Sequence, residues 1–112
     1  MPTSVRDYVY EFTKDMKQLF GKELSKVIIY GSYARGDYTK DSDVDVMILV
    51  KTPEEEIRKY TDQVADCAFE YLMKYGIDIS PVIRNEAHFN YWADDLPYYR
   101  NVREEGVIVN AG

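Results

Sequence analysis

The chain has 112 residues, of which 46% are hydrophobic and 30% are charged, a balance typical of one globular domain with a modest core. Its net charge of −6 and isoelectric point near 4.7 argue against direct nucleic-acid binding, which needs lysine and arginine to neutralise phosphates. One cysteine and one histidine exclude an internal disulfide and a zinc cluster built from these residue types.

The same inspection predicts the cellular location. The sequence contains no run of about 18 apolar residues that would cross a membrane. Its first residues lack the basic and then apolar pattern of a secretory signal. We therefore expect a single domain over residues 1–112 in the reducing cytoplasm, with no membrane contact.

Hydrophobic periodicity in the first half of the chain predicts one helix and two strands. Apolar residues at helical spacing precede a short β-branched run and then a second, longer one. The expected elements are a helix from Ser4 that ends at Gly21, a strand over 26–30, a helical turn over 33–36, a polar loop over 37–42 and a strand over 43–50.

The second half predicts a long helix, a third strand and two shorter helices. Thr52 as N-cap and Pro53 at the first helical position mark the start of the long helix, and Gly76 marks its end. The expected elements after it are a strand over 77–83, a helix capped by Asn85, a helix over 96–105 and a short apolar segment over 107–109.

Chain order and handedness constrain the sheet. The second strand, the long helix and the third strand form one right-handed crossover unit, so these two strands should run parallel. Asp43 and Asp45 open the second strand and Asp78 opens the third, so the three carboxylates should meet at one edge. The pair Gly31-Ser32 reaches that edge only if the first strand is antiparallel to the second. The predicted fold class is therefore α/β (α+β), with a small mixed sheet and helices mainly on one face.

The residues at this corner are suited to binding a metal and a phosphate group. Glycine lets a ligand approach the backbone closely, and a neighbouring serine adds a hydroxyl, so Gly31 and Ser32 favour phosphate binding. Asp43 and Asp45, two apart on a strand, point to the same face and offer the oxygen ligands that Mg²⁺ prefers. The alternatives are a serine that merely shapes a turn and two solvated acids, but the fixed spacing of the two motifs favours the functional interpretation.

Three further residues complete the candidate site. Asp78 lies within an apolar run, where a carboxylate is costly unless it is exposed or paired with a cation, so we interpret it as a third ligand and proton acceptor. Its alternative is an outward-facing strand residue. Arg35 and Lys40 could neutralise phosphate charge, although exposed basic residues are common in such loops.

The pattern Gly31-Ser32, ten residues, Asp43-x-Asp45 and a later Asp78 resembles the minimal nucleotidyltransferases of the polymerase-beta-like superfamily. The resemblance implies a nucleoside triphosphate, ATP for the expected activity, held with two Mg²⁺ ions. Asp43, Asp45 and Asp78 would bind metal, and Asp78 would also activate the acceptor hydroxyl. Gly31, Ser32 and, less specifically, Arg35 would hold the phosphates.

Minimal members of that superfamily are often encoded beside a helical HEPN-type protein. The resemblance therefore implies an antitoxin that transfers AMP to a tyrosine of a HEPN-type toxin. Two alternatives stay open: a small hydroxylated acceptor such as an antibiotic, and a non-enzymatic domain that neutralises its partner by contact. Homodimerisation through the aromatic C-terminal third is a further arrangement that the sequence leaves open.

Overall fold

A computed structural model describes residues 3–109 of the chain. Its centre is a four-stranded sheet with the strand order β3-β2-β1-β4. Strand β1 runs antiparallel to both β2 and β4, whereas β2 and β3 are parallel. The mixed sheet and all three strand directions predicted for β1, β2 and β3 are therefore confirmed.

The elements alternate along the chain as expected. Most bounds agree with the prediction to within about two residues. The elements are α1 (Thr3–Phe20), η1 (Gly21–Glu23), β1 (Leu24–Tyr30), α2 (Ser32–Arg35), β2 (Val44–Val50), α3 (Glu54–Tyr75), β3 (Ile79–Asn85), α4 (Glu86–Trp92), α5 (Pro97–Glu105) and β4 (Val107–Val109).

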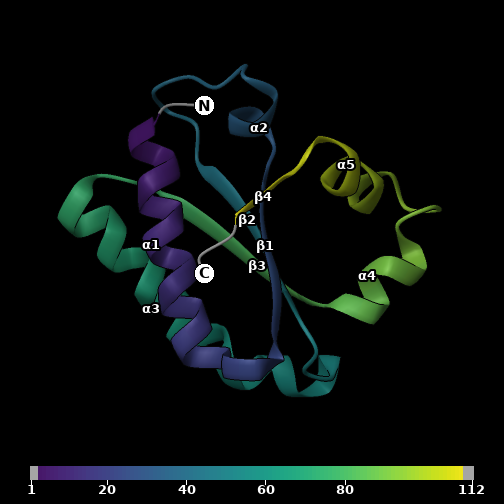
Figure 1. Ribbon diagram of the computed structural model, residues 1–112. Coiled ribbons are helices and arrows are strands. Elements are labelled where there is room, and N and C mark those ends of the chain that lie inside the picture. The colour runs from purple at the N-terminus through teal and green to yellow at the C-terminus, as the bar shows by residue number, and fades with distance from the viewer. Residues whose placement is uncertain (1–2, 110–112) are drawn as a thin grey trace.

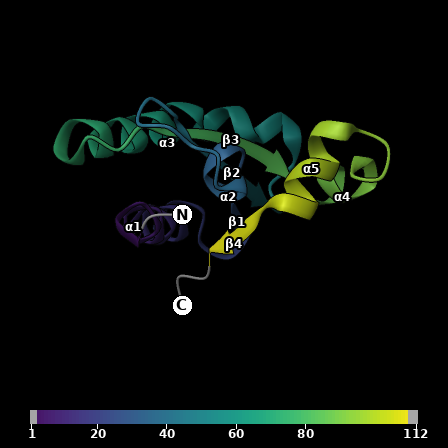
Figure 2. The same ribbon diagram turned by 90° about the horizontal axis from the view of Figure 1, so that it is seen from above.

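The two long helices, α1 and α3, pack on one face of the sheet, and the short helices α4 and α5 cover part of the other (Figures 1 and 2). The first face holds the larger core, with α1 contributing Val9, Phe12 and Met16 at helical spacing. The second core is smaller and centres on Met47, Phe89 and other side chains from the sheet, α4 and α5. Helices thus lie mainly on one face, with a smaller pair on the other.

Strand β2 is the central hydrophobic element and sets the direction of the acidic residues. Because side chains alternate along a strand, Val46 and Ile48 face α1 and α3, whereas Met47 and Leu49 face α4 and α5. All four side chains are fully buried, and each contributes about 1.5–3 kcal/mol through the burial of apolar surface. Asp45 belongs to the second row, so its carboxylate lies on the α5 side of the sheet.

Two local predictions differ from the structure. The third strand begins at Ile79 rather than at residue 77, because Ile79 pairs with Val44 and the Asp78 carbonyl accepts a 2.8 Å hydrogen bond from the Val44 N–H. Asp78 therefore precedes the strand instead of opening it. Helix α3 has Pro53 at its N-cap position, and Thr52 is buried without a capping bond. The predicted caps Gly76 and Asn85 are confirmed.

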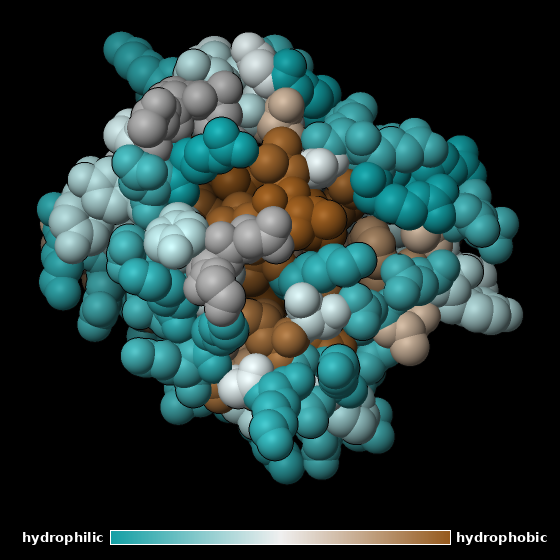
Figure 3. Space-filling model, viewed as in Figure 1, coloured by the Kyte–Doolittle hydropathy of each residue, from teal (hydrophilic) through white to brown (hydrophobic). Residues whose placement is uncertain are grey.

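The edge strand β4 lies on the face shown in Figure 3, where apolar side chains gather between α1 and α5. Ile108 of this strand is 51% exposed. Among residues 3–109, no helix combines the length and the apolar character that a membrane crossing requires.

Candidate active site

The turn from β1 into α2 is shaped by close contact with Asp45. Gly31 adopts φ = +73°, a conformation that favours glycine, and a Cβ at this position would overlap the Asp45 carboxylate. The Arg35 N–H donates to the Gly31 carbonyl at 3.0 Å, which closes the first turn of α2. The glycine predicted to permit a close approach therefore does so first for a side chain of the protein itself.

Asp45 is the most enclosed of the predicted carboxylates. Burial raises its pKa, and the negative charge of Asp43 raises it further, whereas Arg35 acts in the opposite direction. A carboxylate in this position is costly to ionise unless positive charge lies nearby. A bound cation would offset the repulsion between Asp43 and Asp45 and favour the ionised form of Asp45.

Arg35 lies beside the Gly31-Ser32 turn, but its guanidinium is already engaged. Its Nε donates to Asp37 at 3.1 Å, and its Nη1 lies 3.6 Å from Glu105 on α5. Both carboxylates favour the charged guanidinium, with Asp37 the larger influence on the raised pKa. A bound phosphate would compete with these two exposed ion pairs for Arg35.

A cavity of about 400 Å³ opens beside the turn, on the α5 side of the sheet. Its volume lies within the usual range for pockets that bind small molecules. One wall contains the 2.6 Å hydrogen bond between the hydroxyls of Tyr30 and Tyr98. The lining residues are Tyr30, Gly31, Ser32, Arg35, Asp45, Tyr98, Asn101, Val102 and Glu105. Four of the predicted site residues thus line one cavity.

Asp43 and Asp78 form a second acidic group on the other side of Asp45. The hydrogen bond from the Val44 N–H to the Asp78 carbonyl holds Asp78 beside Asp43. The side chains of Asp43 and Asp78 are both exposed. Burial raises the pKa of Asp78, and a hydrogen bond and charge interaction with Asp43 raise it further. This group lines two hollows of its own, of about 220 and 290 Å³.

The loop before Asp43 is ordered by local hydrogen bonds. The Ser42 Oγ accepts from the Thr39 N–H at 2.9 Å, and the Ser42 N–H donates to the Thr39 carbonyl at 3.1 Å. Ser42 therefore caps the loop before Asp43. Lys40 lines the smaller hollow beside Asp43 and Asp78, on the opposite side of the site from Arg35.

The structure brings the predicted carboxylates together as neighbouring pairs. Asp43 influences both Asp45 and Asp78, so it stands between them. Within residues 3–109, however, no three acidic, histidine or cysteine side chains converge closely enough to hold a metal ion as they stand. The donor set still fits Mg²⁺, because all three candidate ligands offer hard carboxylate oxygens.

Some residues at the site were not predicted from the sequence. The 400 Å³ cavity beside Gly31 is also lined by Tyr30, Tyr98 and Asn101, and Tyr30 is distant in the chain from the other two. The position of Tyr30 just before Gly31 was the available signal for that residue. Tyr98 and Asn101 reach the cavity only when α5 packs against β1.

Comparison with known proteins identifies the family of the chain. Residues 9–109 match the family described as "Nucleotidyltransferase domain". Two relatives come from Methanocaldococcus jannaschii. The chain is 40% identical over 93 residues to "Putative protein adenylyltransferase MJ0141", covering 83% of this chain and 92% of that protein. It is 35% identical over 104 residues to "Putative protein adenylyltransferase MJ0604", covering 90% and 93%.

Solved structures show the same fold at lower identity. A "putative nucleotidyltransferase" from Sulfolobus solfataricus aligns with a TM-score of 0.64 and 20% identity, over 95% of this chain and 79% of that one. A toxin-antitoxin structure carrying two aspartate-to-glutamate substitutions aligns with a TM-score of 0.59 and 14% identity, over 96% and 73%. A toxin-antitoxin structure with AMP-PNP aligns with a TM-score of 0.56 and 14% identity, over 92% and 73%.

The match to the family spans about nine tenths of the sequence, and the relatives and the fold agree with it. The chain therefore belongs to the nucleotidyltransferase domain family and has the polymerase-beta-like nucleotidyltransferase fold.

Proposed function

We propose that the protein is a Mg²⁺-dependent adenylyltransferase that transfers AMP from ATP to a tyrosine hydroxyl of a HEPN-type toxin, and so acts as its antitoxin. One observation carries the proposal. The carboxylates lie in a row, with the Gly31-Ser32 turn at Asp45 and an open, exposed acidic pair at Asp43 and Asp78. A donor nucleotide and an acceptor can therefore reach the same row from different sides.

The nucleotide side is the cavity at Gly31 and Ser32. Backbone N–H groups of the turn and the Ser32 hydroxyl would hold the outer phosphates, and Arg35 would exchange Glu105 for a phosphate oxygen. Bound Mg²⁺, two ions by analogy with the family, would neutralise phosphate charge and polarise the α-phosphate. Asp43, Asp45 and Asp78 would supply its protein ligands.

The acceptor side is the Asp78 side. The acceptor oxygen forms a bond to the α-phosphorus while the bond from that phosphorus to the bridging oxygen breaks, and pyrophosphate leaves. The Asp78 carboxylate takes the hydroxyl proton, a role favoured by its raised pKa. Positioning of donor and acceptor on one row supplies much of the remaining rate enhancement.

The choice of AMP and of a protein acceptor is supported by the relatives. Two proteins that are 35–40% identical to the chain carry the name of protein adenylyltransferases. Two structural neighbours are toxin-antitoxin structures, one of them with AMP-PNP. The substituted aspartates named for the other are two positions apart, the same spacing as Asp43 and Asp45.

The test is a mass measurement on a HEPN-type protein co-expressed with the chain. That protein is incubated with the chain, ATP and Mg²⁺, and its intact mass is compared with a reaction that contains the double variant Asp43→Asn/Asp45→Asn. We expect a gain of one or more AMP units that is absent with the variant, and peptide mapping should place it on tyrosine.

Other results would point to the alternatives. Stable binding of the HEPN-type protein without any mass gain would indicate neutralisation by contact. A mass gain on added small alcohols or aminoglycosides, with none on the protein, would indicate a small-molecule acceptor. Either result would overturn the proposal.

A further inference from the structure

A groove runs between helix α3 and the edge strand β3 and ends at the Asp43–Asp78 pair. Its first part is the 290 Å³ hollow lined by Asp43, Asp78, Phe69, Leu72 and neighbouring residues. Its second part is a 470 Å³ hollow farther along the same two elements. Both parts include Ala65 and Pro81, so they form one continuous depression, here called the α3–β3 groove.

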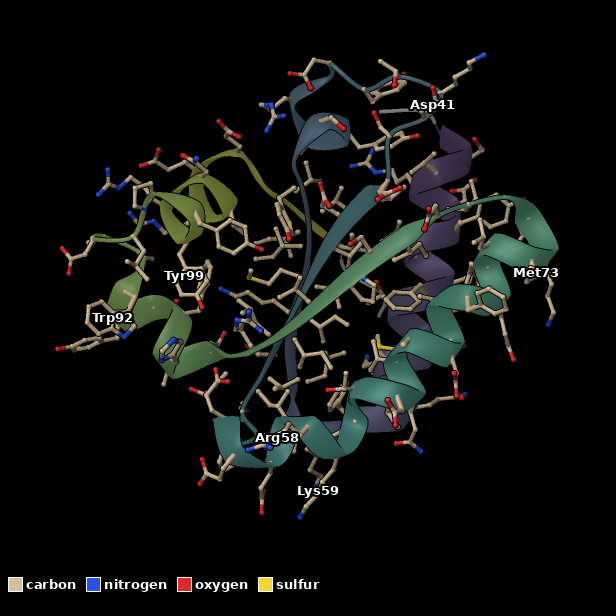
Figure 4. All side chains as sticks on the ribbon, turned by 180° about the vertical axis from the view of Figure 1, so that it is seen from behind. Asp41, Arg58, Lys59, Met73, Trp92 and Tyr99 are labelled. Atoms are coloured by element: carbon tan, nitrogen blue, oxygen red, sulfur yellow. The ribbon has the colours of Figure 1, made fainter. Side chains whose placement is uncertain are left out.

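The length of the groove indicates the size of its occupant. It follows β3 from Ile79 to Arg84, and Arg58 near the start of α3 lines its far end. At about 3.3 Å per residue, this stretch of strand is roughly 20 Å long. Figure 4 shows Arg58 and Met73 toward opposite ends of α3, which runs beside β3. A polypeptide segment fills such a length, whereas a small alcohol fills only one end.

The wall of the groove near the site is apolar and exposed. Phe69 is 58% exposed and Leu72 is 37% exposed, although both belong to a helix whose opposite face is buried. Clustered apolar side chains on a surface mark places where another molecule docks. The neighbouring Ala65 is small and keeps the groove open between its two parts.

Strand β3 is better suited to contacts with the side chains of a partner than to pairing with a further strand. Strand β3 is the outermost strand on this side of the sheet, and an unpaired edge can recruit a further strand. Pro81 lies in the middle of β3 and has no N–H to donate, which discourages such pairing. The occupant is therefore expected to contact α3 and β3 through its side chains.

The charges along the groove also select a partner. Asp43 and Asp78 at the site end favour basic groups beside the reacting side chain. At the far end, Arg58 is exposed, while Glu54 already accepts a 3.0 Å hydrogen bond from the Asn85 N–H. The far end therefore carries charges of both signs and does not by itself select an acidic partner. The concentration of carboxylates at the site end alone gives the docked segment a direction.

We propose that the α3–β3 groove is the docking site of the acceptor protein. A segment of that protein places apolar side chains against Phe69 and Pro81, and its hydroxyl-bearing residue extends from the site end of the groove to Asp78. The inference rests on the proposed function. It follows from in-line transfer, because an acceptor must approach from the side opposite the phosphate-binding turn, and the groove opens on the Asp78 side.

The test compares two exposed apolar residues of the same helix. Phe69→Ser removes a wall of the groove, whereas Met73→Ser alters a residue that is 68% exposed but does not line it. A second groove variant, Ala65→Gln, adds bulk between the two hollows. The probe is the same co-expressed HEPN-type protein. The readouts are binding of that protein without nucleotide, its KM in AMP transfer, and the KM for ATP.

We expect Phe69→Ser and Ala65→Gln to weaken binding and to raise the KM for the acceptor protein at least about tenfold, the usual effect of losing a central contact. The KM for ATP and the behaviour of Met73→Ser should match the unaltered chain. Unchanged acceptor binding and KM in both groove variants would overturn the docking site while leaving the transferase function intact. Groove-dependent binding without transfer by the unaltered chain would overturn the function and retain the docking site. Absence of both binding and transfer would overturn both.

Discussion

On the proposed phosphate side of the carboxylate row, the Gly31 backbone packs so closely against Asp45 that no larger residue fits, and the cavity is walled by α5. On the proposed acceptor side, Asp43 and Asp78 are exposed and open into hollows between α3, β3 and the preceding loop. The difference suits a site that receives the same donor in every cycle but obtains its acceptor from another molecule. Predictions that affect one side only therefore test this division.

The largest effect is expected from Asp45→Asn, because Asp45 lies where the two sides meet. Loss of its charge should reduce AMP transfer by about a thousandfold or more, as expected when a metal-binding carboxylate is removed. Radiolabelled AMP incorporation measures the effect. Asp62→Asn, an exposed acid in α3, is the control for charge and should leave transfer unchanged. Comparable activity of the two variants would exclude Asp45 from the chemistry.

Asp78→Asn should affect mainly the acceptor side, because Asp43 and Asp45 remain as the other two proposed metal ligands. We expect the kcat for transfer to fall about a hundredfold or more, within the range for loss of a general base. The affinity for ATP measured in the presence of Ca²⁺, which does not support turnover, should change little. If ATP affinity falls as much as kcat, then Asp78 belongs to the nucleotide side and the division is wrong.

Gly31→Ala should affect the phosphate side. The new Cβ overlaps the Asp45 carboxylate and places alanine at positive φ, which costs about 1–3 kcal/mol in stability. We expect the KM for ATP to rise about tenfold, since the turn and Asp45 must separate. Thermal unfolding and steady-state kinetics measure the two effects.

Gly36→Ala is a matched control for this substitution. Gly36 also has positive φ, at +87°, but no atom lies within 4 Å of the position of a Cβ there. It should lose less stability, because the new Cβ meets no other atom, and it should keep its KM for ATP. An equal rise in KM for both variants would attribute the effect to backbone strain in the loop rather than to contact with Asp45.

The smallest effect is a pH-dependent change in stability without metal. The pKa values of Asp45 and Asp78 are raised in the folded protein, so their contribution to stability is present below about pH 3.8 and is lost as pH rises through the folded values. Asp43→Asn removes a repulsive charge from both. We expect it to raise the metal-free Tm at pH 7 by roughly 1–5 °C, and by less near pH 4.

The metal dependence completes that test. Added Mg²⁺ should stabilise the unaltered chain and reduce or reverse the advantage of Asp43→Asn, because only binding to the folded site raises the Tm in this way. Differential scanning fluorimetry with and without Mg²⁺ measures both effects. A Tm that Asp43→Asn lowers in metal-free buffer at pH 7 would show that the exposed pair is not repulsive.

The local sequence determined the elements and the polar motifs of this protein. Helical periodicity predicted α1, Gly76 ended α3, and Asn85 capped α4, because each depends on residues a few positions apart. The spacing of Gly31-Ser32 and the two aspartates predicted the turn and the acidic strand. Chain order and handedness predicted the parallel pair β2 and β3, and placing Gly31-Ser32 at the edge of the aspartates predicted that β1 is antiparallel to β2.

Tertiary packing decided which surface each site residue faces. The start of β3 depends on its pairing with Val44, which the apolar run over 77–83 cannot reveal. That pairing places Asp78 beside Asp43 rather than in the ladder. The packing of α5 against β1 brings Tyr98 to the phosphate side, and α3 together with β3 forms the groove that leads to Asp78. These features join residues distant in the chain, and the energy of such contacts exists only once the sheet has assembled.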